Sequence, residues 1–178
     1  MPSALKRIFI AINLPDSIKE SVQSLIEKLP KENVKAVKKE NLHITLKFLG
    51  YMPEEMLQKL YERLQQLDKF KQFEVEISNL GFFKTRVLWV GITRGKERLE
   101  EIAKEIEKLL DLNKEEFTSH ITIARNKDLG YEEFRELVEE LSKISVGGKF
   151  SVQSIDVMES VLEKSGPIYK ILKKIELK

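Results

Sequence analysis

The chain has 178 residues, which is enough for one ordinary domain or for two small lobes around a shared core. Its 31 Lys and Arg residues against 29 Asp and Glu residues leave a formal charge of +2, too small to indicate a nucleic-acid partner by itself. The absence of cysteine excludes disulfides, thiolate chemistry and cysteine-ligated zinc, and no apolar run is long enough to predict a membrane span.

The first half of the chain alternates strand and helix patterns. In order, we predict a strand over 5–14, a helix from Pro15, a short strand over 34–37, a strand over 42–49, a helix from Pro53 and a strand over 73–77. Proline is tolerated at the first turn of a helix, and apolar residues then recur at the spacing of one helix face.

The second half repeats this order. The patterns predict a strand over 86–93, a helix over 96–110, a strand over 117–124, a helix over 131–144 and two closing strands near 148–157 and 167–176. No linker rich in Pro, Gly or Ser separates the halves. We therefore expect residues 1–178 to form a single bilobal domain.

Two matches between the halves indicate an internal duplication. Residues 8–12 align with 88–92, 80 positions apart, and the tripeptide His43-Ile44-Thr45 recurs as His120-Ile121-Thr122, 77 positions apart. The three residues of difference fall in a helix and loops, where changes of length cost little. The alternative is that two unrelated strands share a tripeptide by chance.

Side chains alternate between the two faces of a strand, so the His and Thr of each tripeptide point to one face and the central Ile to the other. Four apolar residues of the first strand are expected to face the core: Leu42, Ile44, Leu46 and Phe48. His43 and Thr45 then share the other face with Lys47, and the second strand places His120 and Thr122 in the same way. Two such strands around a common axis would direct four polar side chains into one cleft.

A pair of histidines across a cleft can supply one neutral base and one protonated acid, which suits displacement at phosphorus. A neighbouring threonine hydroxyl can donate to a phosphate oxygen and hold the group in line. Metal binding is the weaker interpretation, because Glu40 is the only carboxylate within three residues of either histidine. The remaining alternative is that each histidine is a structural or surface residue.

Arg125 needs an irregular strand to join this cleft. Ideal alternation places it on the core side, so the strand must end or bulge near Ala124 before the guanidinium could clamp a phosphate. Otherwise Arg125 is a solvated residue at the end of a strand.

Five blocks of sequence carry a resemblance to a known family: "RIFIAINLP", "NLHITLKFLG", "LWVGI", "HITIAR" and "GPIY". Over essentially its full length the chain resembles the two-histidine phosphoesterases, and among them the RNA 2',3'-cyclic phosphodiesterases first described as 2'-5' RNA ligases. The resemblance implies an α+β fold of two pseudo-symmetric lobes, with antiparallel sheets lining a central cleft and helices outside.

The resemblance also implies an activity and roles for five residues. The activity is hydrolysis of terminal 2',3'-cyclic phosphates of RNA to 2'-phosphomonoesters without metal or cofactor, with the reverse 2'-5' ligation as a minor reaction. By this likeness His120 is the general base and His43 the general acid, while Thr45, Thr122 and Arg125 bind phosphate oxygens. We expect a cytoplasmic monomer whose partners are RNA or oligonucleotide ends, with no membrane partner.

Other residues keep two interpretations. Phe9 and Trp89 are candidates for stacking on a base and are otherwise core residues, while Tyr169 either packs or lines the cleft. Six basic residues form a candidate rim for an RNA backbone or a merely solubilising surface: Lys38, Lys39, Lys47, Lys84, Arg86 and Arg94. The alternative functions are a noncatalytic RNA- or nucleotide-binding module, and a cyclic phosphodiesterase that acts on a small nucleotide.

Overall fold

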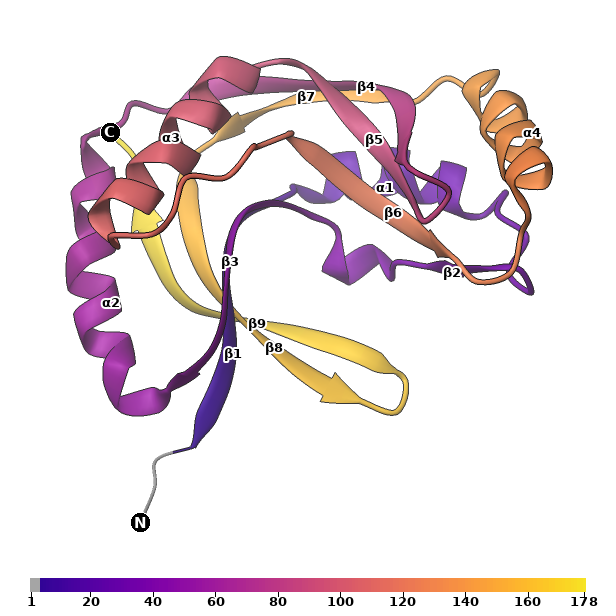
Figure 1. Cartoon of the computed structure of the whole chain (residues 1–178). Coiled ribbons are helices and arrows are strands. Elements are labelled where there is room, and N and C mark those ends of the chain that lie inside the picture. The colour runs from indigo at the N-terminus through magenta and orange to yellow at the C-terminus, as the bar shows by residue number, and fades with distance from the viewer. Residues whose placement is uncertain (1–3) are drawn as a thin grey trace.

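The structure, a computed structural model, describes residues 4–178 and contains two antiparallel sheets (Figure 1). The four-stranded sheet consists, in spatial order, of β3 (His43–Pro53), β1 (Leu5–Asn13), β8 (Ser154–Glu163) and β9 (Gly166–Glu176). The five-stranded sheet consists of β2 (Val34–Ala36), β6 (His120–Asn126), β5 (Val87–Arg94), β4 (Phe73–Phe83) and β7 (Gly147–Val152). The predicted α+β class with antiparallel sheets is confirmed.

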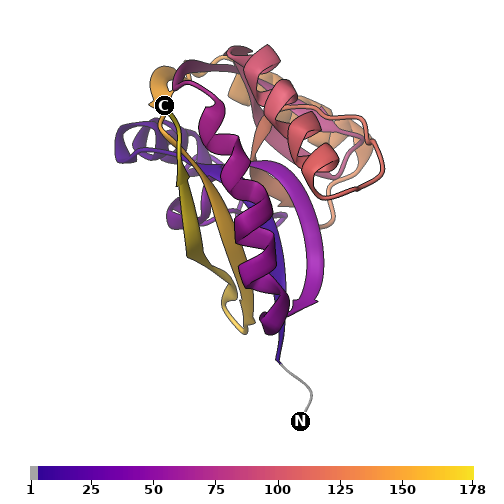
Figure 2. The ribbon, with the colours of Figure 1, turned by 90° about the vertical axis from the view of Figure 1, so that its left-hand side faces the viewer.

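Helices cover these sheets. In residues 4–178 the α-helices are α1 (Asp16–Ile26), α2 (Leu57–Leu64), α3 (Lys96–Leu109) and α4 (Tyr131–Ser142), with 3-10 turns η1 (Lys39–Asn41), η2 (Glu54–Met56) and η3 (Gln65–Lys69). α1 and α4 pack against the five-stranded sheet, whereas α2 lies along the four-stranded sheet and contacts α3 (Figures 1 and 2). None of these helices is long and apolar enough to cross a membrane.

Several predicted boundaries were wrong, among them that of the strand expected over 73–77, which extends to Phe83. The helix expected from Pro53 begins only at Leu57, because β3 continues to Pro53 and a 3-10 turn follows it. The single strand expected near 148–157 is two strands, β7 and β8, that separate at Gln153 and enter different sheets. A continuous β-rich segment does not reveal from its sequence that the chain changes sheets.

One apolar cluster contains buried residues from both sheets. β1 contributes Ile8, Ile10 and Ile12 from the first sheet, and β6 contributes Ile121 and Ile123 from the second. Burial of large aliphatic side chains contributes roughly 1.5–3 kcal/mol each, so this cluster is the main stabilising feature of the fold. The expectation that residues 1–178 form one bilobal domain stays a prediction.

The two sheets are built on the same plan. In each sheet the strand that begins with a histidine pairs with the first strand of its half of the chain, since Thr45 pairs with Ala11 and Thr122 pairs with Trp89. The structural equivalent of Trp89 is therefore Ala11 and not Phe9, and the sequence alignment of Phe9 with Trp89 was wrong by two residues. Both segments are strings of apolar residues, which align almost equally well in either register.

Candidate active site

A β-bulge follows the second His-x-Thr tripeptide. Thr122 pairs with Trp89 and Ala124 pairs with Leu88, so Ile123 is the extra residue in β6. Ile123 and Ala124 are both buried, and the strand then returns Arg125 to the side of Thr122. The predicted bulge near Ala124 is confirmed, and Arg125 lines the cleft beside the histidines.

The first tripeptide is followed by a bulge at the same place. Thr45 pairs with Ala11 and Lys47 pairs with Ile10, which leaves Leu46 as the extra residue in β3. The prediction that Phe48 faces the core was therefore wrong: its side chain is 63% exposed and lines the cleft. Local alternation fails here because a bulge reverses the face of every residue beyond it.

One cavity of about 530 Å³ brings the two tripeptides together. Among its lining residues are the members of both motifs and two further predicted residues: His43, Thr45, His120, Thr122, Arg125 and Tyr169. Strands from both sheets contribute them: β3 and, for Tyr169, β9 from the first sheet, and β6 from the second. Two imidazoles, two hydroxyls and a guanidinium thus line the same cavity.

Backbone carbonyl groups orient the two imidazoles. His43 donates from Nδ1 to the carbonyl oxygen of Asn41 at 2.7 Å, and His120 donates from Nδ1 to that of Thr118 at 2.7 Å. A carbonyl oxygen only accepts, so the proton of each neutral ring resides on Nδ1 and Nε2 is the basic atom. The Nε2 atom of His43 lies 2.8 Å from Oγ1 of Thr45, which can donate to it.

Asn41 has a second role beside His43. Its side chain is 7% exposed, and Nδ2 donates to the carbonyl oxygen of Pro167 at 2.8 Å. Pro167 lies two residues before Tyr169 in the β8–β9 hairpin. The carbonyl group that holds His43 is thereby tied to a part of the chain more than 120 residues away.

The protein environment favours the neutral form of both histidines. Burial lowers the pKa of His43, its hydrogen bond to Asn41 opposes this effect, and the nearby charges of His120 and Lys19 lower the pKa further. Burial likewise lowers the pKa of His120, opposed by the hydrogen bond to Thr118 and assisted by the positive charge of Arg125. An anion bound in the cleft would act in the opposite direction.

An aromatic ring covers each imidazole. Tyr169 meets His43 edge-to-face at 5.3 Å between ring centroids, and Phe83 meets His120 in the same manner at 4.9 Å. Phe9 also packs on His43, at 5.1 Å, but is only 2% exposed and belongs to a small buried cluster. These apolar edges exclude water from the rings and account for the desolvation that lowers both pKa values.

The sequence model of the 2'-5' RNA ligase superfamily matches residues 14–162. The chain belongs to this superfamily. It is 35% identical to the RNA 2',3'-cyclic phosphodiesterase of Archaeoglobus fulgidus, with 96% of this chain and 99% of that protein covered. It is also 35% identical to the RNA 2',3'-cyclic phosphodiesterase of Methanocaldococcus jannaschii, covering 94% and 98% of the two chains.

Solved structures share the fold of this chain. E. coli LigT in its apo form superposes with a TM-score of 0.81 at 23% identity, over 99% of each chain. The protein TT0787 of Thermus thermophilus gives a TM-score of 0.76 at 26% identity, over 96% of this chain and 97% of that one. The arrangement of two antiparallel sheets is therefore common to these proteins.

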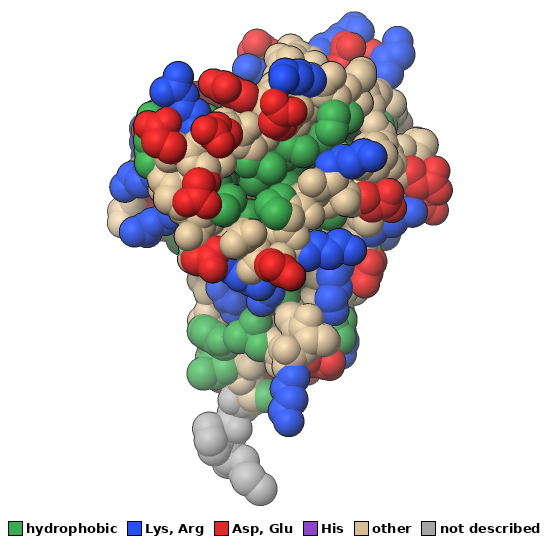
Figure 3. Space-filling model, turned by 90° about the vertical axis from the view of Figure 1, so that its right-hand side faces the viewer, with side chains coloured by type: hydrophobic (Ala, Val, Ile, Leu, Met, Phe, Trp, Pro, Cys, Tyr) green, Lys and Arg blue, Asp and Glu red, His purple; other side chains and the backbone are tan. Residues whose placement is uncertain are grey.

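Three of the six residues in the predicted basic rim are paired with carboxylates. Lys47 contacts Glu107 at 3.1 Å and Glu115 at 2.8 Å, and Arg94 contacts Glu74 at 2.8 Å. On the face that carries α4, basic and acidic side chains are interspersed instead of forming a continuous basic surface (Figure 3). Within residues 4–178 no group of three or more histidines and carboxylates is arranged to hold a metal ion.

Four residues that shape the cleft were not found from the sequence. Phe48 was assigned to the core, Phe83 was not singled out, and Asn41 and Thr118 act through their backbone carbonyls. One signal was available, since the carbonyl acceptors precede each histidine by two residues, at positions 41 and 118. The side-chain types at these two positions differ, so the repeat was hidden from a comparison of residue types.

Proposed function

We propose that this chain is an RNA 2',3'-cyclic phosphodiesterase that opens terminal 2',3'-cyclic phosphates to 2'-phosphomonoesters. The observation that carries the proposal is the shared cavity into which His43 and His120 project, each with Nδ1 held by a backbone carbonyl. An acid–base pair needs two such groups, each with a nitrogen available for proton transfer, whereas a site that only binds RNA does not. The names of the relatives at 35% identity support the same activity.

The cleft holds the phosphate by three groups. The hydroxyls of Thr45 and Thr122 donate to its non-bridging oxygens, and the guanidinium of Arg125 adds a permanent positive charge. The negative charge of the phosphate then raises the pKa of the adjacent imidazoles, so that one of them carries a second proton in the complex. Burial lowers these pKa values in the free protein, and bound substrate therefore selects the working protonation state.

Proton transfer follows from this arrangement. Nε2 of His120 removes a proton from a water molecule as its oxygen forms a bond to phosphorus. The bond from phosphorus to the ribose 3'-oxygen breaks, and Nε2 of His43 gives its proton to that oxygen. The product is a 2'-phosphomonoester with a free 3'-hydroxyl, and the assignment of base and acid follows the family resemblance.

We further propose that the reaction needs no metal ion and that a 5'-hydroxyl can replace water as the nucleophile, which joins the cyclic phosphate to it as a 2'-5' bond. The two imidazoles keep their roles, since His120 takes the proton of the 5'-hydroxyl and His43 again protonates the 3'-oxygen. Water at its normal concentration favours hydrolysis, which leaves ligation as the minor activity. We also expect the protein to be cytoplasmic and monomeric. A mass near 20.7 kDa in solution would support the monomer.

One assay tests the proposed activity. RNA with a terminal 2',3'-cyclic phosphate is incubated with the protein and EDTA, and the product is identified by phosphorus NMR. We expect a 2'-phosphomonoester, and losses of at least about a hundredfold in kcat/KM for His43→Gln and for His120→Gln. Loss of activity in EDTA would contradict the metal-free mechanism, and tight binding without turnover would indicate a noncatalytic module.

A further inference from the structure

A second cavity adjoins the cleft on the same face of the five-stranded sheet. This cavity, here called the Trp89 pocket, has a volume of about 310 Å³ and shares Phe117 and Thr118 with the cleft. Trp89 lines it and pairs with Thr122 across β5 and β6, and paired residues of neighbouring strands project to the same side. A ligand chain that leaves the cleft past His120 therefore meets the Trp89 pocket next.

The indole of Trp89 lies flat against the sheet. A Cβ atom added to Gly81 would lie 2.2, 2.3 and 2.6 Å from three successive atoms of the six-membered ring, which places it over the ring face and not at the ring edge. A Cβ atom on Gly91 would lie 3.2 Å from the same ring. Two glycines thus make room for one face of the indole. Phe83 contacts the indole at 5.2 Å between ring centroids, and the part of the indole that Phe83 leaves uncovered borders the pocket.

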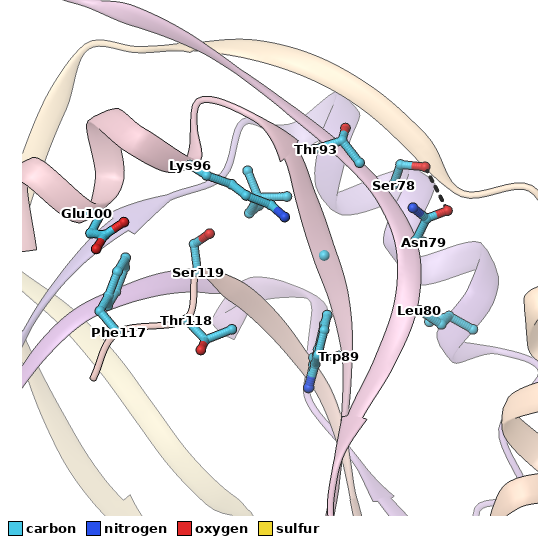
Figure 4. Close-up of a pocket in the computed structure, with 12 residues that line it drawn as sticks. Ser78, Asn79, Leu80, Trp89, Thr93, Lys96, Glu100, Phe117, Thr118 and Ser119 are labelled. Atoms are coloured by element: carbon cyan, nitrogen blue, oxygen red, sulfur yellow. Dashed lines mark hydrogen bonds between the residues drawn. The ribbon is translucent and has the colours of Figure 1, made fainter. Parts of the chain in front are cut away.

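Polar side chains surround this aromatic surface. Figure 4 shows Lys96 and Glu100 on the side of α3, Ser78 and Asn79 on β4, and Ser119 on the segment before β6. Serine and asparagine supply both donors and acceptors for the edge of a nucleobase, and lysine suits a phosphodiester. Glu100 is paired with Lys104 at 3.0 Å, which offsets its negative charge.

We propose that the Trp89 pocket binds the nucleotide on the 5' side of the cyclic-phosphate nucleotide, with its base stacked on the indole. The inference rests on the proposed function and specifies the substrate as an RNA end of at least two nucleotides. The centroids of Trp89 and His120 are 6.0 Å apart, so the stacking surface directly adjoins the reaction site. A mononucleotide leaves this surface empty.

Steady-state kinetics on three substrates test the subsite. They are a 2',3'-cyclic mononucleotide, the corresponding dinucleotide, and the same dinucleotide without its 5' base. Base stacking on an aromatic side chain contributes enough to change affinity by about tenfold, so we expect kcat/KM for the complete dinucleotide to exceed that for the abasic one by about this factor. The Trp89→Leu substitution should reduce this ratio to about one, mainly through KM.

A matched pair of lysine variants keeps the test independent of the indole. Lys96→Met should lower kcat/KM for both dinucleotides relative to the mononucleotide, and the effect should weaken as salt is raised. Lys28→Met, at an exposed lysine just beyond α1, should leave kcat/KM unchanged for all three substrates. Equal turnover of the complete and abasic dinucleotides by the wild type, or an equal loss on all three substrates in Trp89→Leu, would overturn the subsite.

Fluorescence gives a readout without catalysis, because Trp89 is the only tryptophan in the chain. Titration with a dinucleotide 2'-phosphate should change the emission of Trp89 more than titration with its abasic counterpart at equal saturation. Identical changes would reject stacking at this site even if turnover were absent. If the protein hydrolysed none of the three cyclic substrates, that result would instead count against the proposed function.

Discussion

Phe48 and Arg125 occupy equivalent positions in the two halves of the molecule, five residues after His43 and His120 respectively. Each follows a bulge at a buried aliphatic residue, and each lines the cleft. The duplicated backbone therefore presents a cation on one side and an apolar ring on the other. This asymmetry fits a nucleotide, whose phosphate is anionic and whose base is flat and apolar on its faces.

The asymmetry predicts different effects on phosphate binding. Arg125→Met removes a charge-assisted contact worth about 1.5–3 kcal/mol, so we expect inorganic phosphate to inhibit turnover about ten- to a hundredfold more weakly. Phe48→Met, the matched change at the equivalent position, should alter phosphate inhibition by less than about twofold. Equal weakening in both variants would contradict the assignment of Arg125 to the phosphate.

Lys47 connects the two halves at the cleft. Its side chain is 10% exposed and joins Glu107 of α3, which is 8% exposed, and Glu115 before β6. We expect Lys47→Met to lower the free energy of unfolding by about 3 kcal/mol, because it leaves a buried carboxylate without its partner.

The double variant Lys47→Met with Glu107→Met removes both charges and should recover much of this loss, as judged by urea unfolding. Purely additive losses would show that the two side chains act independently. Arg98→Met, in the exposed pair with Glu101, serves as the control and should cost less than about 1 kcal/mol.

Acid should destabilise the fold partly through the histidines. Burial lowers the pKa of His43 below its usual value of 6.5, so the neutral ring stabilises the fold above pH 6.5 and this contribution is lost as the pH falls from 6.5 to the folded-state pKa. His43→Gln has no such proton to gain. We expect its unfolding free energy to fall less than that of the wild type between about pH 7.5 and pH 5.

The position of the Trp89 ring over Gly81 leads to a prediction about substitutions of this glycine. A Cβ atom at this position collides with the ring of Trp89, so Gly81→Ala should cost about 1–3 kcal/mol of stability by overpacking. Combining it with Trp89→Leu, which removes the obstructing ring atoms, should cost clearly less than the sum of the two single changes in thermal unfolding. Simple additivity would mean that the alanine acts on the backbone alone.

The periodicity of the sequence predicted the order of most elements and the common face of each His-x-Thr pair, because these depend on local patterns. The strand near Ala124 was expected to bulge because Arg125 could not otherwise reach the cleft, and β6 has this bulge. The bulge at Leu46 was missed, since no charged residue lay on the wrong face to reveal it. The change of sheet at Gln153 and the register of Phe9 depend on long-range pairing, which local patterns do not specify.

The division of labour between His43 and His120 is the central claim, and a change of leaving group tests it directly. A cyclic substrate with sulfur in place of the 3'-oxygen releases a thiolate, which needs no proton from an acid. We predict that His43→Gln hydrolyses this substrate nearly as fast as the wild type, while His120→Gln remains slow on both substrates. Sulfur that rescues neither variant, or that rescues only His120→Gln, would contradict the account.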